Sequence, residues 1–272
     1  MLATKFGSVT KMAQGIPLTN EQLYRVAPSI FAGEKHESRS NRYTYIPTIQ
    51  VIEGLRSEGF LPFSACQSRS RIEGKSEFTK HMIRLRRQDQ ILANEANEII
   101  LINSHDGTSS YQMLAGMFRF VCQNGMITGD TVEDIRVQHR GNIVDNVIDA
   151  AYTIVDQFAI TNESMGAMKE IQLSRPEEEV FARSALALKY GDLEKQPITP
   201  RQLLLPKRLD DGNSSLWTKF NVVQENLMKG GQRGRAASGK KITTRPVQSI
   251  DGNVKLNRAL WILADEMARL KA

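Results

Sequence analysis

The sequence lacks the marks of several protein classes. Only two cysteines occur among the 272 residues, Cys66 and Cys122, which argues against a disulfide framework and favours a reducing cytoplasm. No run of about 18 apolar residues is present to span a membrane. Residues 1–17 also lack the continuous apolar stretch and cleavage site of a secretory signal. We therefore expect a cytoplasmic protein without membrane contact.

Motifs for nucleotides, metals and nucleophilic catalysis are also missing. Neither a P-loop nor a Gly-x-Gly-x-x-Gly turn between a strand and a helix occurs, and no His-x-x-x-His or Cys-x-x-Cys spacing is found. His81, His105 and His139 are scattered. A metal- or thiol-dependent enzyme centred on His105, Asp106 and Cys122 is an open alternative, but a cysteine flanked by apolar residues is typical of a small buried hydrophobe. We expect no enzymatic activity and no cofactor.

What the chain does have is a globular composition with unevenly placed charge. About 40% of residues are apolar and the net charge is +6. Residues 229–258 contain eight cations against Asp251 alone, a balance of +7, whereas residues 130–194 contain thirteen acidic and six basic residues, a balance of −7. Such asymmetry indicates an end that faces a polyanion, although a basic loop that merely aids solubility is the simpler alternative.

The hydrophobic periodicity predicts an α+β fold. Residues 60–72 and 81–86 alternate in the manner of two antiparallel strands joined by a loop, and residues 98–103 form a third, buried strand. Residues 110–120 fit either a strand or a short helix. Short helices are expected over residues 19–26 and from Thr48, as a cap, to Gly59. The first half is therefore predicted to be a β-meander packed with helices.

The second half is predicted to be helical. Apolar residues recur at helical spacing from Val132 to Phe158, with Gly141 delaying the start. Further helices are expected from Ser174 to Gly191, from Ser215 to Gly230 and over residues 254–270. The predicted organisation is a polar segment at residues 1–40, a meander core at 41–130, a helical region at 131–228, a flexible basic arm at 229–250 and a terminal helix at 251–272.

The basic arm is the strongest candidate for a binding site. Its run from Lys229 to Lys241 alternates cations with glycine, alanine and serine. Cations neutralise phosphates, and glycine lets a backbone follow a strand of unspecified sequence. The candidate nucleic-acid ligands here are Lys229, Arg233, Arg235, Lys240, Lys241 and Arg245.

A second basic cluster falls on the two predicted strands. If the alternation holds, Arg84 and Arg86 share one strand face, opposite Ile83 and Leu85, and such a face could track a nucleic-acid backbone. A solvated outer face is an equally good interpretation. Tyr43 and Tyr45 could stack bases but more often pack. The candidate ligands in this cluster are Arg69, Arg71, Lys80, Arg84, Arg86 and Arg87, with Lys75 beside them.

Several blocks of the sequence resemble a family of phage- and plasmid-like proteins without an assigned activity, carried on prophages and other mobile elements. The blocks are Arg42-Tyr43 before Pro47-Thr48, residues 118–126, residues 215–217, residues 221–226 with Gly230-Gly231, and Leu260-Trp261. The resemblance covers the chain from about residue 40 and implies work on replicating, recombining or invading DNA. The order of elements also looks like that of phage single-strand annealing proteins such as Red beta and Erf.

The expected function is that of a non-catalytic DNA-binding protein of a mobile element. It would prefer single strands, possess the capacity to anneal complementary ones, and form homo-oligomers that build a continuous groove. An alternative of a different class is an interaction protein that binds a host defence or replication factor through the acidic helical region.

Overall fold

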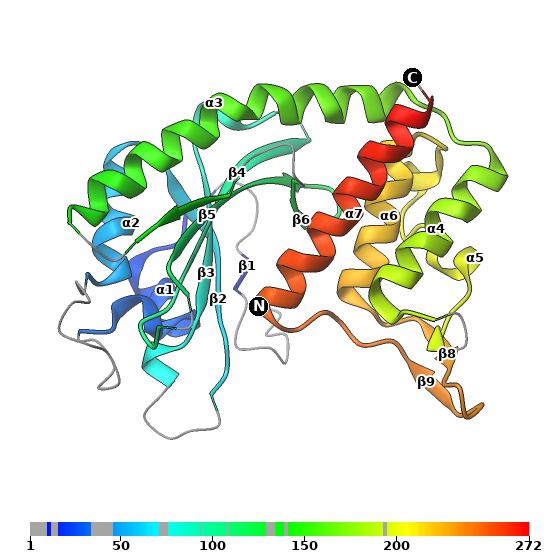
Figure 1. Ribbon diagram of the computed structural model, residues 1–272, viewed down its shortest axis with the longest axis horizontal. Helices are drawn as coiled ribbons and strands as arrows, with labels where there is room; N and C mark the ends of the chain where they lie inside the picture. The colour runs from blue at the N-terminus through cyan, green and yellow to red at the C-terminus, as the bar shows by residue number, and fades with distance from the viewer. Residues whose placement is uncertain are drawn as a thin grey trace. The chain divides into compact units, whose positions relative to one another are not determined.

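The computed structural model describes residues 10–11, 16–33, 46–70, 76–92, 94–107, 109–128, 134–138, 141–192 and 195–271. The chain divides into two compact units, one formed by residues 1–125 with 132–158 and the other by residues 126–131 with 159–272. The first holds an antiparallel sheet and the second a group of helices (Figure 1). The predicted α+β class is confirmed.

The sheet is a meander whose strands follow the chain order. Among the described residues it has seven strands in the order β1-β2-β3-β4-β5-β6, with β7 also paired to β5. Residues 110–120, left open between helix and strand, form β5. The strands are β1 (Thr10–Lys11), β2 (Leu61–Gln67), β3 (His81–Arg86), β4 (Glu95–Asn103), β5 (Tyr111–Arg119), β6 (Asn124–Ile127) and β7 (Ile135–Val137).

Helices cover one face of this sheet, where apolar residues from alternate positions of its strands gather. Ile83 and Leu85 of β3 lie in one buried cluster with Ile99 and Leu101 of β4. Packed onto them are α1 (Asn20–Val26), α2 (Thr48–Ser57) and the first half of α3 (Ile143–Glu170). The helix predicted from Val132 thus begins only after Gly141, as its glycine indicated.

Thr48 has a different role from the predicted helix cap. It is the first residue of α2, with Pro47 in the cap position, and its fully buried side chain faces the sheet. Its hydroxyl oxygen lies 2.9 Å from His81 Nε2 and 3.1 Å from His105 Nε2, and it accepts a hydrogen bond of 3.0 Å from Asn103. One hydroxyl therefore satisfies polar groups of two strands and a loop, all without solvent contact.

The second unit consists of helices whose ends match the predicted signals. Ser174 forms a capping box with Glu177 at the start of α4, and Ser215 accepts from the Thr218 amide at the start of α6. Gly191 and Gly230, both at positive φ, end these helices. The helices are α4 (Arg175–Tyr190), α5 (Pro200–Leu203), α6 (Leu216–Lys229) and α7 (Ile250–Lys271), the last starting earlier than the predicted residue 254.

The core of this unit surrounds α6, in which every residue from Leu216 to Leu227 is buried. Trp217 and Phe220 of α6 meet Trp261 of α7 edge to face, with ring centroids 6.2 and 5.9 Å apart. Both tryptophans of the chain therefore report on this unit. Across the part of the chain that the structure describes, no helix combines the length and apolar character needed to cross a bilayer.

Replacing Thr48 with Val should destabilise the first unit by roughly 1–3 kcal/mol, because it leaves buried imidazole and amide groups without their shared partner while it preserves side-chain shape. Urea unfolding followed by circular dichroism, with hydrogen exchange of the β4 amides, measures the change. Thr153→Val is the control, since its exposed hydroxyl donates to the Asp149 carbonyl of its own helix; its effect should stay within about 0.5 kcal/mol. Equal effects of the two substitutions would contradict the role of Thr48.

Acid should weaken the same region. Burial, reinforced by the neighbouring His105, lowers the pKa of His81 from 6.5 to about 3. In this pH range the imidazole of His81 is protonated in the unfolded chain and stays neutral in the folded chain. The free energy of unfolding therefore falls as the pH drops from about 6.5 toward 3. Urea unfolding across this range should show a shallower pH dependence for His81→Gln, which does not titrate. An identical dependence in both proteins would exclude His81 as the cause.

Candidate nucleic-acid interface

The segment predicted as a flexible basic arm contains a β-hairpin. Strands β8 (Arg233–Arg235) and β9 (Lys241–Thr243) pair antiparallel, with Arg233 opposite Thr243, Gly234 opposite Ile242 and Arg235 opposite Lys241. We call residues 231–244 the basic hairpin. The sequence pattern did not indicate this strand pairing, because it took each glycine as a source of freedom, whereas glycines here also meet specific steric demands.

Gly234 decides how the basic hairpin sits on its unit. A Cβ at this position would lie 2.0 Å from the Pro197 carbonyl oxygen and 2.9 Å from the Ile198 side chain. The adjacent Arg235 amide donates a hydrogen bond of 2.9 Å to the same carbonyl. Gly234 therefore lies against residues 197–198, and this close approach is open only to glycine.

The opposite face of the basic hairpin carries its cations. Side chains alternate along a strand, so Arg233 and Arg235 share a face with Lys241 across the pair. All three residues are exposed, as are Lys240 and Arg245. In the described part of the chain none of these five forms an ion pair with a carboxylate, and residues 231–249 contain no Asp or Glu. Five candidate ligands thus lie together on one segment, three of them on one ribbon face.

Close backbone contacts join the hairpin to the end of α6. Gly230 and Gly231 both have positive φ, and a Cβ on Gly230 would meet the Thr244 carbonyl oxygen at 2.6 Å. The Gly231 amide donates to that carbonyl at 2.8 Å. Lys189 of α4 donates to the carbonyls of Leu227 and Arg245, and burial lowers the pKa of Lys189 to about 8. Both ends of the hairpin are therefore fixed to the helices.

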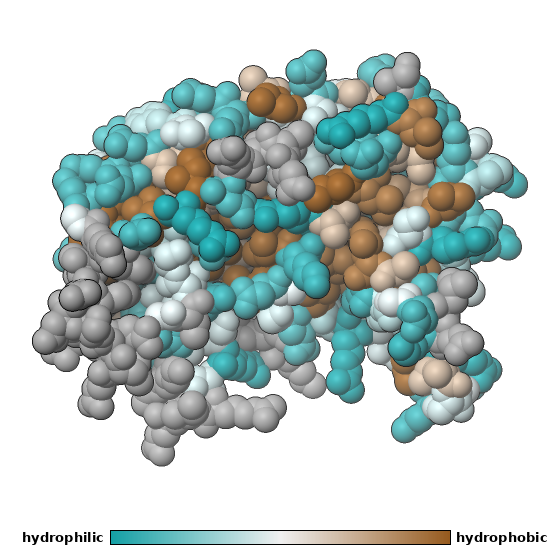
Figure 2. Space-filling model, in the orientation of Figure 1, coloured by the Kyte–Doolittle hydropathy of each residue, from teal (hydrophilic) through white to brown (hydrophobic). Residues whose placement is uncertain are grey.

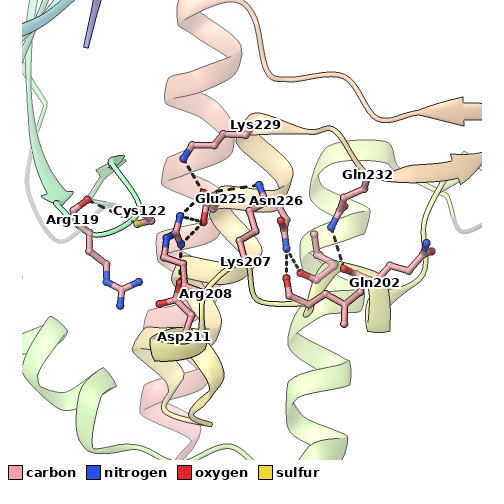
Figure 3. A network of polar contacts seen from close by, with 12 residues as sticks. Arg119, Cys122, Gln202, Lys207, Arg208, Asp211, Glu225, Asn226, Lys229 and Gln232 are labelled. Carbon is pink, nitrogen blue, oxygen red and sulfur yellow. Dashed lines mark hydrogen bonds and ion pairs between the residues drawn. The ribbon is translucent and has the colours of Figure 1, made fainter. Parts of the chain in front are cut away.

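Side-chain amides fix one strand edge of the hairpin (Figure 3). Gln202 of α5 donates to the Arg233 carbonyl at 3.1 Å, and Gln232 donates back to the Gln202 carbonyl at 3.0 Å. Asn226 of α6 holds the end of α5 and the chain just after it by donating to the carbonyls of Leu203 and Leu205 at 2.8 and 3.0 Å. The segment 221–226, noted in the sequence as a family block, thus supports the surface that carries the cations.

Glu225 anchors the connector before α6 (Figure 3). Arg208 donates to both of its carboxylate oxygens, at 2.7 and 2.9 Å, and also to Asp211 at 2.8 Å. Burial would raise the pKa of Glu225, but hydrogen bonds from Arg208 and Lys229 outweigh it and hold the pKa below its usual value. Lys229, a predicted nucleic-acid ligand, lies 2.8 Å from Glu225; it is engaged within the unit.

The prediction that Arg84 and Arg86 form a cationic track on the sheet surface is wrong, because both side chains are buried. Arg84 and Arg86 do lie opposite Ile83 and Leu85, but both are buried. They bind the fully buried Glu98 at 2.6 and 2.8 Å. Alternation shows that Arg84 and Arg86 share a face, but it cannot distinguish a solvated face from one that encloses an ion pair. The burial of Glu98 on the neighbouring, largely apolar strand β4 decides that this face is buried.

Arg86 is held by aromatic rings as well. Its guanidinium carbon lies 4.0 Å from the centroid of Phe118, 4.7 Å from that of Phe63 and 5.3 Å from that of Phe120. Such stacking satisfies a buried guanidinium at faces where no hydrogen-bond acceptor is needed. Phe118 and Phe120 belong to the family block at residues 118–126, which has a structural role here.

The other predicted ligands of the sheet unit are dispersed. Arg87 pairs with Asp89 at 2.6 Å and lies 5.5 Å from the Phe60 ring. Arg69 is exposed and Lys80 half-buried. Arg71, like Lys75, Tyr43, Tyr45 and His139, lies outside the described residues. No second cationic surface comparable with the basic hairpin is defined by these described positions.

The residues of the alternative enzyme, His105, Asp106 and Cys122, have structural partners. Asp106 is buried, and its amide donates a hydrogen bond of 3.1 Å to the Phe78 carbonyl. His81 and His105, scattered in the sequence, lie with ring centroids 5.6 Å apart, but both bind Thr48. Cys122 is buried, with its sulfur 3.9 Å from the Arg119 carbonyl oxygen. Among the described residues, no group of three or more His, Cys, Asp or Glu side chains is arranged to hold a metal ion.

Sequence reasoning missed the residues that hold the hairpin. Pro197, Gln202 and Gln232 lie in segments that the sequence marks only as a connector and an arm. The Arg-Gly-Arg pattern at 233–235 was the available signal, since a single glycine between two exposed cations fits a strand whose inner face touches another backbone.

The fold and site define an α+β protein that carries a basic hairpin on its helical unit. The chain belongs to the family described as a domain of unknown function, DUF932, which matches residues 35–261. It is 50% identical over 266 residues to two Escherichia coli K12 proteins, UPF0380 protein YafZ and UPF0380 protein YfjQ, with 98% of this chain and 97% of each relative covered. No solved structure matches the chain. The predicted membership of a family without an assigned activity is confirmed.

Gly234→Ala should disrupt the docking of the basic hairpin, because the new Cβ would collide with the Pro197 carbonyl oxygen. We expect a loss of roughly 1–3 kcal/mol in the free energy of unfolding, measured by tryptophan fluorescence, and faster hydrogen exchange over residues 233–243. Gly166→Ala in α3 is the control: its Cβ would meet open space, so it should stabilise by up to about 1 kcal/mol. Unchanged exchange in Gly234→Ala would show that the docking is unimportant.

Proposed function

We propose that this protein binds DNA through the basic hairpin and acts on the DNA of mobile genetic elements. The observation that carries the proposal is the exposed ribbon face formed by Arg233, Arg235 and Lys241, with Lys240 and Arg245 nearby and no carboxylate in residues 231–249. The likeness of the sequence blocks to phage- and plasmid-like proteins supports the mobile-element setting.

Energetic reasoning favours a polyanion as the ligand. Cations that only keep a surface soluble need no fixed arrangement. Even where such a cation pairs with an exposed carboxylate, the ion pair contributes at most about 1 kcal/mol to stability. Here the backbone beneath the cations is held by Pro197, Gln202 and the glycines at 230–231. Fixed spacing of unpaired cations lowers the cost of ordering them against successive phosphates, and each neutralised phosphate releases counterions.

The combined substitution Arg233→Ala, Arg235→Ala and Lys241→Ala should weaken DNA binding and reduce its salt dependence. Each lost phosphate contact lowers the slope of log affinity against log salt by about 1, so the slope should fall by about 3. Fluorescence anisotropy with labelled DNA between about 50 and 200 mM salt measures both quantities.

The matched control removes the same number of charges from the helices of the same unit. Arg175→Ala, Arg183→Ala and Arg269→Ala change three exposed cations, and the salt slope should stay near that of the wild type. Equal losses in the two triple variants would reduce the site to net charge. Absence of binding by the wild-type protein to any DNA at low salt would exclude the proposed function altogether.

A further inference from the structure

Resting on the proposed DNA-binding function, we infer that the basic hairpin binds double-stranded DNA by entering the major groove as a two-stranded ribbon. Single strands, the ligand expected from the sequence, would then be the weaker ligand. The inference depends on what the hairpin lacks, on its width, on its tip and on how it is held.

The basic hairpin lacks the means by which proteins hold unpaired bases. Single-strand binding without sequence preference combines cations with aromatic rings on which bases stack, each worth about 1–3 kcal/mol. Residues 229–249 contain no Phe, Tyr or Trp. The hairpin also extends beyond the ends of α4 and α6 (Figure 1), and in Figure 2 that end shows hydrophilic residues beside pale and weakly hydrophobic ones. A ribbon that projects from its unit can enter a groove in its ligand more readily than it can form a groove that holds a single strand.

The dimensions of the ribbon match the major groove of DNA. Two paired strands lie about 4.8 Å apart, and the major groove, about 12 Å wide, admits a two-stranded ribbon with its side chains. The minor groove, about 6 Å wide, is too narrow for the same ribbon. Double-stranded RNA is excluded by the same argument, because its major groove is deep and narrow.

The tip of the hairpin is small enough to reach the base edges. Its turn is closed by hydrogen bonds from the Gly239 amide to the Ala236 carbonyl at 2.8 Å and from the Ala236 amide to the Lys240 carbonyl at 2.9 Å. Gly239 takes the positive φ that this turn requires. Ala236, Ala237, Ser238 and Gly239 therefore form a tip without bulky side chains, and alanine methyl groups suit contact with thymine methyls.

The cations flank this tip on a fixed frame. Arg235 and Lys241 lie directly opposite each other, with Arg233 one step behind on the same face. Arg235 uses one guanidinium N–H on the Gly239 carbonyl at 3.1 Å, which leaves the rest of its planar fork for phosphate or for the O6 and N7 acceptors of guanine. The edge of β8 is occupied by Pro197 and Gln202, so the ribbon enters without reorganising.

Ligand comparison tests the inference directly. Anisotropy should show a duplex of roughly 20 base pairs bound at least about tenfold more tightly than its single strand or the duplex RNA of the same sequence, a difference of about 1.4 kcal/mol. Methyl green, a major-groove ligand, should displace the protein from the duplex, and distamycin, a minor-groove ligand, should not.

Enlarging the tip separates groove entry from charge. Ala237→Trp, at an exposed position of the turn, should weaken duplex binding about tenfold while single-strand binding stays equal or improves, because the indole offers a stacking platform. Val180→Trp, at an exposed position of α4, is the control and should change neither affinity. Circular dichroism melting of each variant confirms that the unit is folded.

The outcomes distinguish this inference from the proposed function. Tighter duplex binding, displacement by methyl green and a duplex-specific loss in Ala237→Trp support groove entry. Salt-dependent binding that favours single strands, or displacement by distamycin alone, overturns the inference and leaves DNA binding through the hairpin standing. Absence of binding to every nucleic acid overturns both.

Discussion

The close approach of Gly234 to the Pro197 carbonyl determines the character of the whole candidate interface. A strand has two faces, and here one is committed to backbone packing so tightly that a single methyl group cannot fit. Because side chains alternate along a strand, Arg233 and Arg235, on either side of Gly234, point to the solvent face. One steric constraint thus converts a run of basic residues into an oriented surface.

The constraint depends in turn on α6, the helix around which the second unit is built. Asn226 and Glu225 are polar residues on a helix buried along its length, and each reaches outward to hold a segment of irregular chain. Their burial is stable because their partners are complete: Glu225 has a bidentate arginine, and Asn226 has two carbonyls. A buried polar group on a helix is costly unless satisfied, and when satisfied it fixes what it touches.

Local signals in the sequence were sufficient for much of the fold. The capping serines 174 and 215 and the terminal glycines 191 and 230 were identified because helix ends are decided by adjacent residues. The alternation over residues 81–86 gave the correct faces of β3 as well. The period of a strand shows which residues share a side and says nothing of what covers that side, so the burial of Arg84 and Arg86 escaped prediction.

The misjudged elements share this dependence on distant partners. Thr48 looked like a cap because threonine commonly precedes a helix, but His81, Asn103 and His105, far away in sequence, turn its hydroxyl to the sheet. Gly230 and Gly234 gave no local sign of their packing, because the backbones that they approach, at residues 244 and 197, lie beyond any local window. Tertiary context, absent from a single sequence, decided both.

The direct opposition of Arg235 and Lys241 across the ribbon has an energetic consequence of its own. Like charges facing each other across a strand pair repel and weaken the pairing, so the unbound hairpin holds its register against its own charge. A polyanion laid along that face would remove the repulsion. Added salt screens the repulsion between Arg235 and Lys241 in the free protein, and it also screens the attraction between these cations and a bound polyanion. Both effects favour the free protein. The hairpin is therefore most stable at the salt concentrations at which it binds its ligand most weakly.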